Sequence, residues 1–301
     1  AVAPPSGRTM PSLLLKVAQW THQDLAMTAQ QLGRAQLLTV PYSHYCEIAK
    51  WSLAASGVPF DEVACPPVAH VLPTLATRFP AGGGRRVAAD SSSIATSATS
   101  IPLLALPSGE VLLDSWQIVN FASKTRPNLG VVPDSLRALL DEELGPLTRQ
   151  SCYAVLLKEK NYAAWSGLVT HNTSLLWRLA WYVIGGRITS FMVKTFRAHD
   201  AARISECEAK LRESFDRVGA ELKKLTPAGA PFIGGALPGL SDIAAASLVA
   251  PKCFPDAYCG GVFYPYFSQI LTADEAAKMD AEMYRATALG RHCMSVYAAG
   301  R

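Results

Sequence analysis

The sequence predicts an α/β region followed by an all-helical region. Residues 36–40 are a short apolar, partly β-branched run, and residues 58–63 alternate in the manner of a second strand. A stretch of helical spacing between them ends at Gly57. A strand, a helix and a strand within about 30 residues form a βαβ unit, whose two strands are parallel. Beyond about residue 135 the apolar residues follow the helical period only. The fold class expected is therefore α/β plus all-α.

A β-hairpin and one more helix complete the predicted α/β region. Residues 101–106 and 111–113 are strand-like runs around a Pro-Ser-Gly-Glu turn, and a helix is expected over residues 116–124. Asp114 and Ser115 stand where that helix needs capping groups. The expected organisation is an N-terminal extension (1–34), an α/β domain (35–125) with an insertion (66–100), a linker (126–135) and a helical domain (136–301).

Composition and charge argue against several classes of protein. Half of the 301 residues are apolar and 17% are charged, which allows a substantial core. The net charge of +4 is mild and the Lys and Arg residues are scattered, which argues against nucleic-acid binding. The seven widely spaced cysteines fit neither a disulfide scaffold nor a zinc site. We expect a reducing compartment and no metal.

The first 34 residues have the composition of a targeting segment. They contain one acidic residue, Asp24, against three basic residues. This composition resembles the neighbourhood of a cleaved organelle-targeting leader. We expect a soluble protein of a chloroplast or mitochondrion if such a leader is removed, and a cytoplasmic one otherwise.

The nearest candidate for a transmembrane segment is the run at residues 175–184. It is interrupted by Arg178 and is shorter than the roughly 18 residues that a spanning helix needs. Such a run is typical of a buried helix more often than of a membrane contact. We therefore expect no transmembrane segment, and we expect this run to lie in the core.

Ser43 stands between the first predicted strand and the helix that follows it. A hydroxyl in the first turn of a helix lies in the field of unpaired backbone N–H groups, which stabilise a developing anion. Ser43 can therefore favour the thiolate form of a bound thiol, or it can simply cap the helix. The motif by itself leaves both roles open.

Four segments, taken together, resemble the glutathione transferases. Residues 40–53 (VPYSHYCEIAKWSL) resemble the start of the family's first helix, and Ile101-Pro102 and Asp114-Ser115 resemble two later landmarks in the same order and spacing. Residues 231–246 resemble the helix-opening motif of the family's second domain. The resemblance extends from residue 36 to about residue 260. It implies a thioredoxin-like N-terminal domain followed by the family's helical C-terminal domain.

The resemblance also implies a chemistry. Ser43 occupies the position of the family's catalytic serine or cysteine, which implies activation of the glutathione thiol for conjugation to an electrophile or for peroxide reduction. A hydroxyl cannot form a disulfide, so thiolate activation is favoured over a mixed disulfide. Cys46, three residues later, is expected to be a packed helix residue.

The remaining site residues follow from the same resemblance. Pro102 matches the family's cis-proline, beside which the backbone of Ile101 pairs with the cysteinyl part of glutathione. Asp114 and Ser115 match the pair that holds the γ-glutamyl end. The carboxylate suits the ligand's ammonium, and the hydroxyl and helix N-terminus suit its α-carboxylate. Helix capping is the alternative role of both residues, and the two roles are compatible.

The sequence departs from the family pattern in two places. Gly239 replaces the usual Ser or Thr cap, which leaves Asp242 without that partner, and the insertion at 66–100 falls where the glycine end of glutathione is normally held. Arg85 and Arg86 could reach the carboxylate of that glycine end, but solvated loop charges are the simpler interpretation of both.

The expected partners are glutathione, as co-substrate, and a small apolar electrophile. Aromatic residues available to line the electrophile's pocket are Tyr153, Trp165, Trp177, Trp181 and Tyr182. Because fold does not fix function, two other functions stay open: a non-catalytic subunit of a larger, organellar assembly, and a carrier of apolar ligands. The oligomeric state is open as well, between a homodimer and a larger assembly.

Overall fold

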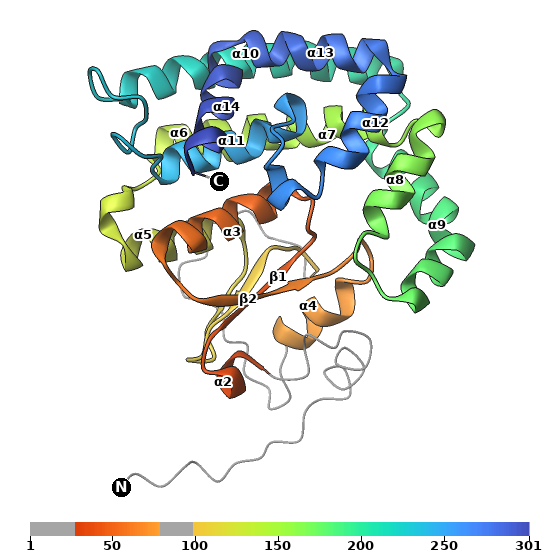
Figure 1. Cartoon of the computed structure of the whole chain (residues 1–301), viewed down its shortest axis with the longest axis horizontal. Helices are drawn as coiled ribbons and strands as arrows, with labels where there is room; N and C mark the ends of the chain where they lie inside the picture. The colour runs from red at the N-terminus through yellow and green to blue at the C-terminus, as the bar shows by residue number, and fades with distance from the viewer. Residues whose placement is uncertain (1–27, 79–98, 301) are drawn as a thin grey trace, which may run out of the picture. The chain divides into compact units, whose positions relative to one another are not determined.

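The computed structural model describes residues 28–78 and 99–300 (Figure 1). The described residues divide into two compact units. The sheet unit comprises the residues up to 40 together with 58–118, and the helical unit comprises 41–57 together with the residues from 119. Most of the expected extension over 1–34 and residues 79–98 of the expected insertion lie outside the described residues.

The sheet unit contains one four-stranded mixed sheet in the order β2-β1-β3-β4. Its strands are β1 (Ala35–Thr39), β2 (Phe60–Ala64), β3 (Leu103–Ala105) and β4 (Val111–Leu112). β1 runs parallel to β2 and antiparallel to β3, and β3 and β4 form an antiparallel hairpin. The parallel pair and the hairpin that the sequence predicts are both confirmed.

The core of the sheet unit lies around the central strand. Every residue of β1 is buried, as its continuous apolar run suggests. Two further elements are α2 (Ala29–Leu32) and α4 (Val71–Arg78), of which α4 contributes Ala76 to the core. The buried cluster consists of Leu38, Val63, Cys65, Ala76, Leu103, Val111 and Leu113.

Helix α3 (His44–Ser56) follows β1 in the chain but packs within the helical unit. It ends at Gly57, whose φ of 76° is left-handed and whose N–H reaches the carbonyls of the last turn, as the sequence predicts. The Tyr258 hydroxyl donates to the Tyr42 carbonyl at 3.1 Å, and the rings of Trp51 and Tyr297 pack with centroids 4.7 Å apart. These contacts fix the start and the middle of α3.

The rest of the chain is helical, so the predicted fold class is confirmed: a thioredoxin-like α/β region followed by an all-helical region. The longer helices are α5 (Ser115–Thr125), α7 (Gly145–Leu156), α9 (Leu175–Phe196), α10 (Ala201–Leu225), α11 (Leu240–Cys253), α13 (Glu275–Ala286) and α14 (Ala288–Gly300). The shorter ones are η2 (Pro127–Leu129), α6 (Asp134–Ala138), η3 (Leu139–Leu144), η4 (Glu159–Asn161), α8 (Tyr162–Val169), η5 (Tyr258–Gly261) and α12 (Tyr264–Ala273).

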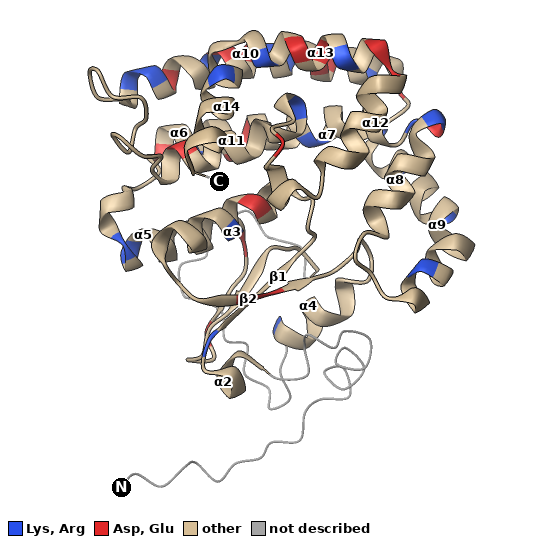
Figure 2. Ribbon diagram, viewed as in Figure 1, with Lys and Arg blue, Asp and Glu red and all other residues tan. Residues whose placement is uncertain are grey.

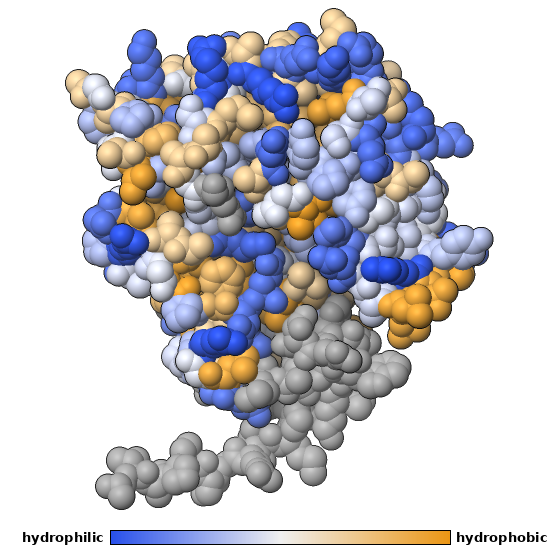
Figure 3. Space-filling model, in the orientation of Figure 1, coloured by the Kyte–Doolittle hydropathy of each residue, from blue (hydrophilic) through white to orange (hydrophobic). Residues whose placement is uncertain are grey.

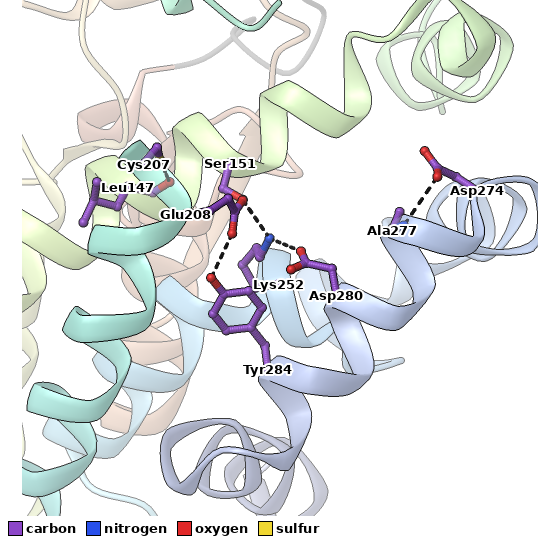
Figure 4. A network of polar contacts seen from close by, with 9 residues as sticks. All are labelled: Leu147, Ser151, Cys207, Glu208, Lys252, Asp274, Ala277, Asp280 and Tyr284. Carbon is purple, nitrogen blue, oxygen red and sulfur yellow. Dashed lines mark hydrogen bonds and ion pairs between the residues drawn. The ribbon is translucent and has the colours of Figure 1, made fainter. Parts of the chain in front are cut away.

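Helix α11 is the centre of the helical unit, because every one of its residues is buried. This burial includes the ammonium group of Lys252, which donates to Ser151 at 2.7 Å and to Glu208 at 3.3 Å and also pairs with Asp280 (Figure 4). Burial raises the pKa of Glu208, but the Lys252 charge and the hydrogen bonds from its neighbours outweigh burial and lower that pKa overall. The buried charges are therefore paired, as buried charges must be.

The expectation that residues 175–184 lie in the core is wrong. These residues form the first half of α9, in which Trp181 is buried but Leu175, Leu176, Leu179, Tyr182 and Val183 are exposed. α9 buries one side only, through Trp181, Gly185, Thr189 and Met192, and the helical period turns the other apolar side chains outward. Among the described residues, no helix is both long and apolar enough to cross a membrane.

Asp242 holds the start of α11 together. As the sequence indicates, the N-cap is Gly239, which has no hydroxyl to contribute. The buried carboxylate nevertheless accepts hydrogen bonds from the backbone N–H groups of Gly239, Ile233 and Gly234 at 2.8 to 3.0 Å. Burial raises the pKa of Asp242, but His292 and these N–H groups lower it by more, so the net shift is downward.

We predict that Asp242→Ala lowers the free energy of unfolding by about 3 kcal/mol, because it leaves three backbone donors without their acceptor. Urea unfolding followed by circular dichroism measures the change. Asp216→Ala, an exposed position on α10, is the control and should change stability by less than about 0.5 kcal/mol.

The stability difference between the wild type and Asp242→Ala should depend on pH. Since the folded-state pKa of Asp242 is depressed, its contribution is complete above the ordinary carboxyl range near pH ~4 and is lost as the pH falls through the folded-state value. The difference between wild type and Asp242→Ala should therefore shrink in acid. A difference that stays constant below that range would contradict the role given to this carboxylate.

Candidate functional site

The sheet unit brings four of the predicted site residues to two loops. The Ile101–Pro102 peptide bond is cis, the form that the resemblance implies, and it lies immediately before β3. Asp114 and Ser115 follow β4 and open α5. Since β3 and β4 are hydrogen-bonded neighbours, the sheet places the two loops on adjacent strands.

Asp114 uses one of its carboxylate oxygens to cap α5. Its Oδ1 accepts the backbone N–H of Gln117 at 2.8 Å, and the Gln117 side chain in turn accepts the N–H of Leu113 at 2.9 Å. The capping role expected for this position is therefore present. The second oxygen, Oδ2, is buried and accepts no hydrogen bond from any residue that the structure describes. Capping of α5 thus uses one carboxylate oxygen of Asp114, and the other oxygen remains an acceptor for which the described residues supply no donor.

Arg78, at the end of α4, connects the two loops. Its Nη2 donates to the carbonyl of Ser100 at 3.3 Å and to the carbonyl of Leu113 at 3.5 Å. These carbonyls directly precede Ile101 and Asp114, and the Arg78 side chain is buried. The guanidinium fork suits this task, because it presents several donors in one plane.

Sequence reasoning missed Arg78, and the arginines that it considered, Arg85 and Arg86, lie outside the described residues. The position lies in the expected insertion at residues 66–100, a stretch without clear periodicity. A single basic residue in a stretch of this kind is typical of a solvated surface charge. The feature that distinguishes Arg78 from such a charge is its position at the end of α4, a short helix that also contributes Ala76 to the core.

Ser43 lies in the helical unit, at the start of α3. Its backbone is extended and its carbonyl accepts the N–H of Glu47 at 2.9 Å, which begins the helix. The hydroxyl, however, makes no capping hydrogen bond. Of the two roles that the sequence left open, capping by the side chain is thus absent. Ser43 is half-buried and stands at the N-terminus of α3, where the first backbone N–H groups have no partner within the helix itself.

The neighbours of Ser43 in sequence supply no general base. His44 is buried with its Nε2 3.2 Å from the carbonyl of Gly145, and burial, helped by the charge of Arg149, lowers its pKa to about 3. Burial likewise raises the pKa of Tyr45 to about 12. Both side chains are therefore neutral near pH 7. The Ser43 hydroxyl and the helix N-terminus are polar groups at this point that need no change of protonation state.

The cysteines are packed rather than reactive. All seven are buried and free, including Cys46, which confirms the role expected for Cys46. Burial raises the pKa of Cys152 to about 12, so this thiol stays protonated at physiological pH. In the described part of the chain, no group of three or more His, Cys, Asp or Glu residues could hold a metal ion.

No protein-family model matches the chain, and no curated protein sequence matches it. Several solved glutathione transferases are similar to it. One from Methylobacillus flagellatus with glutathione bound is 16% identical, covers 86% of this chain and 98% of its own, and has a TM-score of 0.42. One from Ceriporiopsis subvermispora in complex with glutathione is 16% identical over 80% of this chain and 98% of its own, with a TM-score of 0.43.

A third similar structure is the Tau class glutathione transferase from mango, Mangifera indica. It is 15% identical, covers 88% of this chain and 99% of its own, and has a TM-score of 0.40.

We predict that Arg78→Met destabilises the two loops, because the carbonyls of Ser100 and Leu113 lose a buried donor, at a cost of about 1–3 kcal/mol. Hydrogen–deuterium exchange should become faster in peptides covering residues 99–118.

Arg34→Met is the matched control in the same unit. Arg34 pairs with Asp61 at the surface, where an ion pair is worth about 0–1 kcal/mol. Equal exchange in residues 99–118 for the two variants would show that Arg78 does not hold the loops.

Proposed function

We propose that the chain is a glutathione transferase-like protein: Asp114 and Ser115 hold the γ-glutamyl end of glutathione, and the Ser43 hydroxyl activates its thiol. The observation that carries this proposal is the buried Oδ2 of Asp114, which the described residues leave without a donor. An unsatisfied buried polar atom costs about 1–3 kcal/mol, and more when it is charged. A ligand that supplies a donor removes this cost.

The start of α5 suits an α-amino acid group in particular. An ammonium group offers both N–H donors and a positive charge to the Asp114 carboxylate. The Ser115 side chain and the first N–H groups of α5 suit a carboxylate next to it. The γ-glutamyl end of glutathione carries an ammonium and a carboxylate on one carbon, which matches this pair of groups.

The thiol chemistry rests on Ser43. The sheet register pairs Leu38 of β1 with Leu103, next to Pro102, and Ser43 follows the end of β1 by four residues. The Ser43 hydroxyl makes no capping bond and stands at a helix N-terminus. Donation of a hydrogen bond to sulfur stabilises the thiolate, so the thiol proton passes to water at lower pH.

The thiolate then attacks an electrophilic carbon and forms a C–S bond, while the bond from that carbon to its leaving group breaks and the leaving group departs as an anion. With a peroxide the thiolate attacks oxygen and the O–O bond breaks, which gives an alcohol and the sulfenic acid of glutathione. A second glutathione then condenses with the sulfenic acid to form glutathione disulfide and water.

We predict that Ser43→Ala lowers kcat/KM about 100-fold for conjugation of glutathione to a small apolar electrophile such as a chlorodinitrobenzene. The rising limb of the pH–rate profile should also move to higher pH, because the bound thiolate loses a stabilising donor. Stopped-flow or steady-state absorbance assays from pH 5 to pH 9 measure both effects.

Two controls separate this role from a structural one. Ser43→Thr keeps a hydroxyl and should retain most of the activity, whereas Ser190→Ala, at an exposed position of α9, should retain all of it. If Ser43→Ala turns over normally, the catalytic assignment fails. If the wild type neither binds glutathione nor turns it over, the proposal fails, and co-purification in a stable complex would then favour a non-catalytic subunit of a larger assembly.

A further inference from the structure

The first half of α9 exposes a continuous apolar surface. The α9 strip, as we name it, consists of Leu175, Leu176, Leu179, Tyr182 and Val183, whose exposed fractions lie between 58 and 90%. In Figure 3 a hydrophobic patch lies at the lower right of the view, over the lower end of α9 as placed in Figure 1. Scattered exposed apolar residues are normal, but five on three turns of one helix form a patch of the kind that marks an interaction site.

The strip is a persistent feature of the folded helical unit, because the other side of α9 is attached to it. Trp181 and Thr189 are buried on that side, and the indole N–H of Trp165 on α8 donates to the Thr189 hydroxyl at 3.0 Å. Trp165 and Trp181 also pack edge to face. One side of α9 is therefore held by the protein, and the strip faces outward.

The charged side chains of α9 all have one sign. Residues 161–199 contain four Arg or Lys residues and no Asp or Glu. Figure 2 accordingly shows basic but no acidic positions on α9. Arg178, Arg187 and Lys194 are exposed. Of the ion pairs among the described residues, none involves these three side chains.

Helix α10, which follows α9 in the chain, carries charges of both signs. There, acidic residues alternate with basic ones along the helix, and Arg203 and Lys210 both pair with Glu206. The excess of positive charge thus belongs to the helix that also carries the apolar strip.

We propose that α9 docks on the surface of a lipid bilayer that contains anionic lipids. A helix with an apolar face and flanking Arg and Lys residues lies in the interface, with its apolar side chains at the boundary of headgroups and acyl chains. The α9 strip would enter that boundary, and Arg178, Arg187 and Lys194 would lie near lipid phosphates. Tyr182, the most exposed of the strip residues, is of a type that favours this depth.

Charge decides between this partner and a second copy of the chain. If two copies met through α9, their arginines and lysines would come together with no acidic side chain on α9 to balance them. An anionic lipid surface supplies the opposite charge over its whole area. Because the strip stands on an exposed helix rather than in a groove, a fluid surface can also accommodate it without a shaped pocket.

Vesicle co-sedimentation of the full chain tests the proposal. We expect binding to phosphatidylcholine vesicles that contain about one third phosphatidylserine, and clearly weaker binding to pure phosphatidylcholine vesicles or at high salt. The variant Leu176→Glu/Leu179→Glu/Val183→Glu should bind the anionic vesicles about 100-fold more weakly. The variant Arg178→Gln/Arg187→Gln/Lys194→Gln should lose binding to a similar extent, since each basic residue near an anionic surface contributes a factor of about five.

The control is Met279→Glu, which places the same charge at another exposed apolar position, on α13. Its binding should equal that of the wild type, and unchanged urea unfolding midpoints show that the α9 variants fold. Absence of binding to anionic vesicles overturns the proposal, as does equal binding by the α9 variants and Met279→Glu. A lipid-free dimer in sedimentation equilibrium that Leu179→Glu abolishes would likewise overturn it, in favour of self-association.

Discussion

The Arg78 guanidinium holds the carbonyls of Ser100 and Leu113, and the geometry of the candidate glutathione site depends on this pair of hydrogen bonds. One of these carbonyls precedes the cis-proline loop and the other precedes the start of α5. With both loops fixed, Asp114 can satisfy α5 with one oxygen and keep the other oxygen buried without a donor. A buried acceptor of this kind destabilises the fold while it has no donor, and it gains most from a charged ligand.

The local elements could be predicted from the sequence because single residues determine them. Gly57 ends α3 in a left-handed conformation, and the turn between β3 and β4 follows its Pro-Ser-Gly sequence. Contacts between distant segments could not be predicted in this way. The Arg78 hydrogen bonds and the N–H groups of Ile233 and Gly234 that reach Asp242 depend on the paths of loops, which carry no periodic signal.

Two apolar helices, α9 and α11, show where hydropathy fails as a guide to burial. α11 is buried on all sides and α9 on one side only, although both are rich in apolar residues. Local sequence could not distinguish them, because the neighbours of a helix, and not its own composition, decide how many of its faces are covered. Lys252 is the converse case, a charged residue of α11 that is buried although its side chain is not apolar. Its burial is tolerated because Glu208 and Asp280 pair with it. Burial in this unit thus follows partners rather than residue type.

The central claim is that the start of α5 binds the γ-glutamyl end of glutathione through Asp114. Isothermal titration of the full chain with glutathione tests it most directly, with Asp114→Ala titrated in parallel. The account predicts saturable heat with a Kd at or below the millimolar range, and binding at least about tenfold weaker in the variant. Absence of saturable heat with the wild type, or equal affinity of the two proteins, would contradict it.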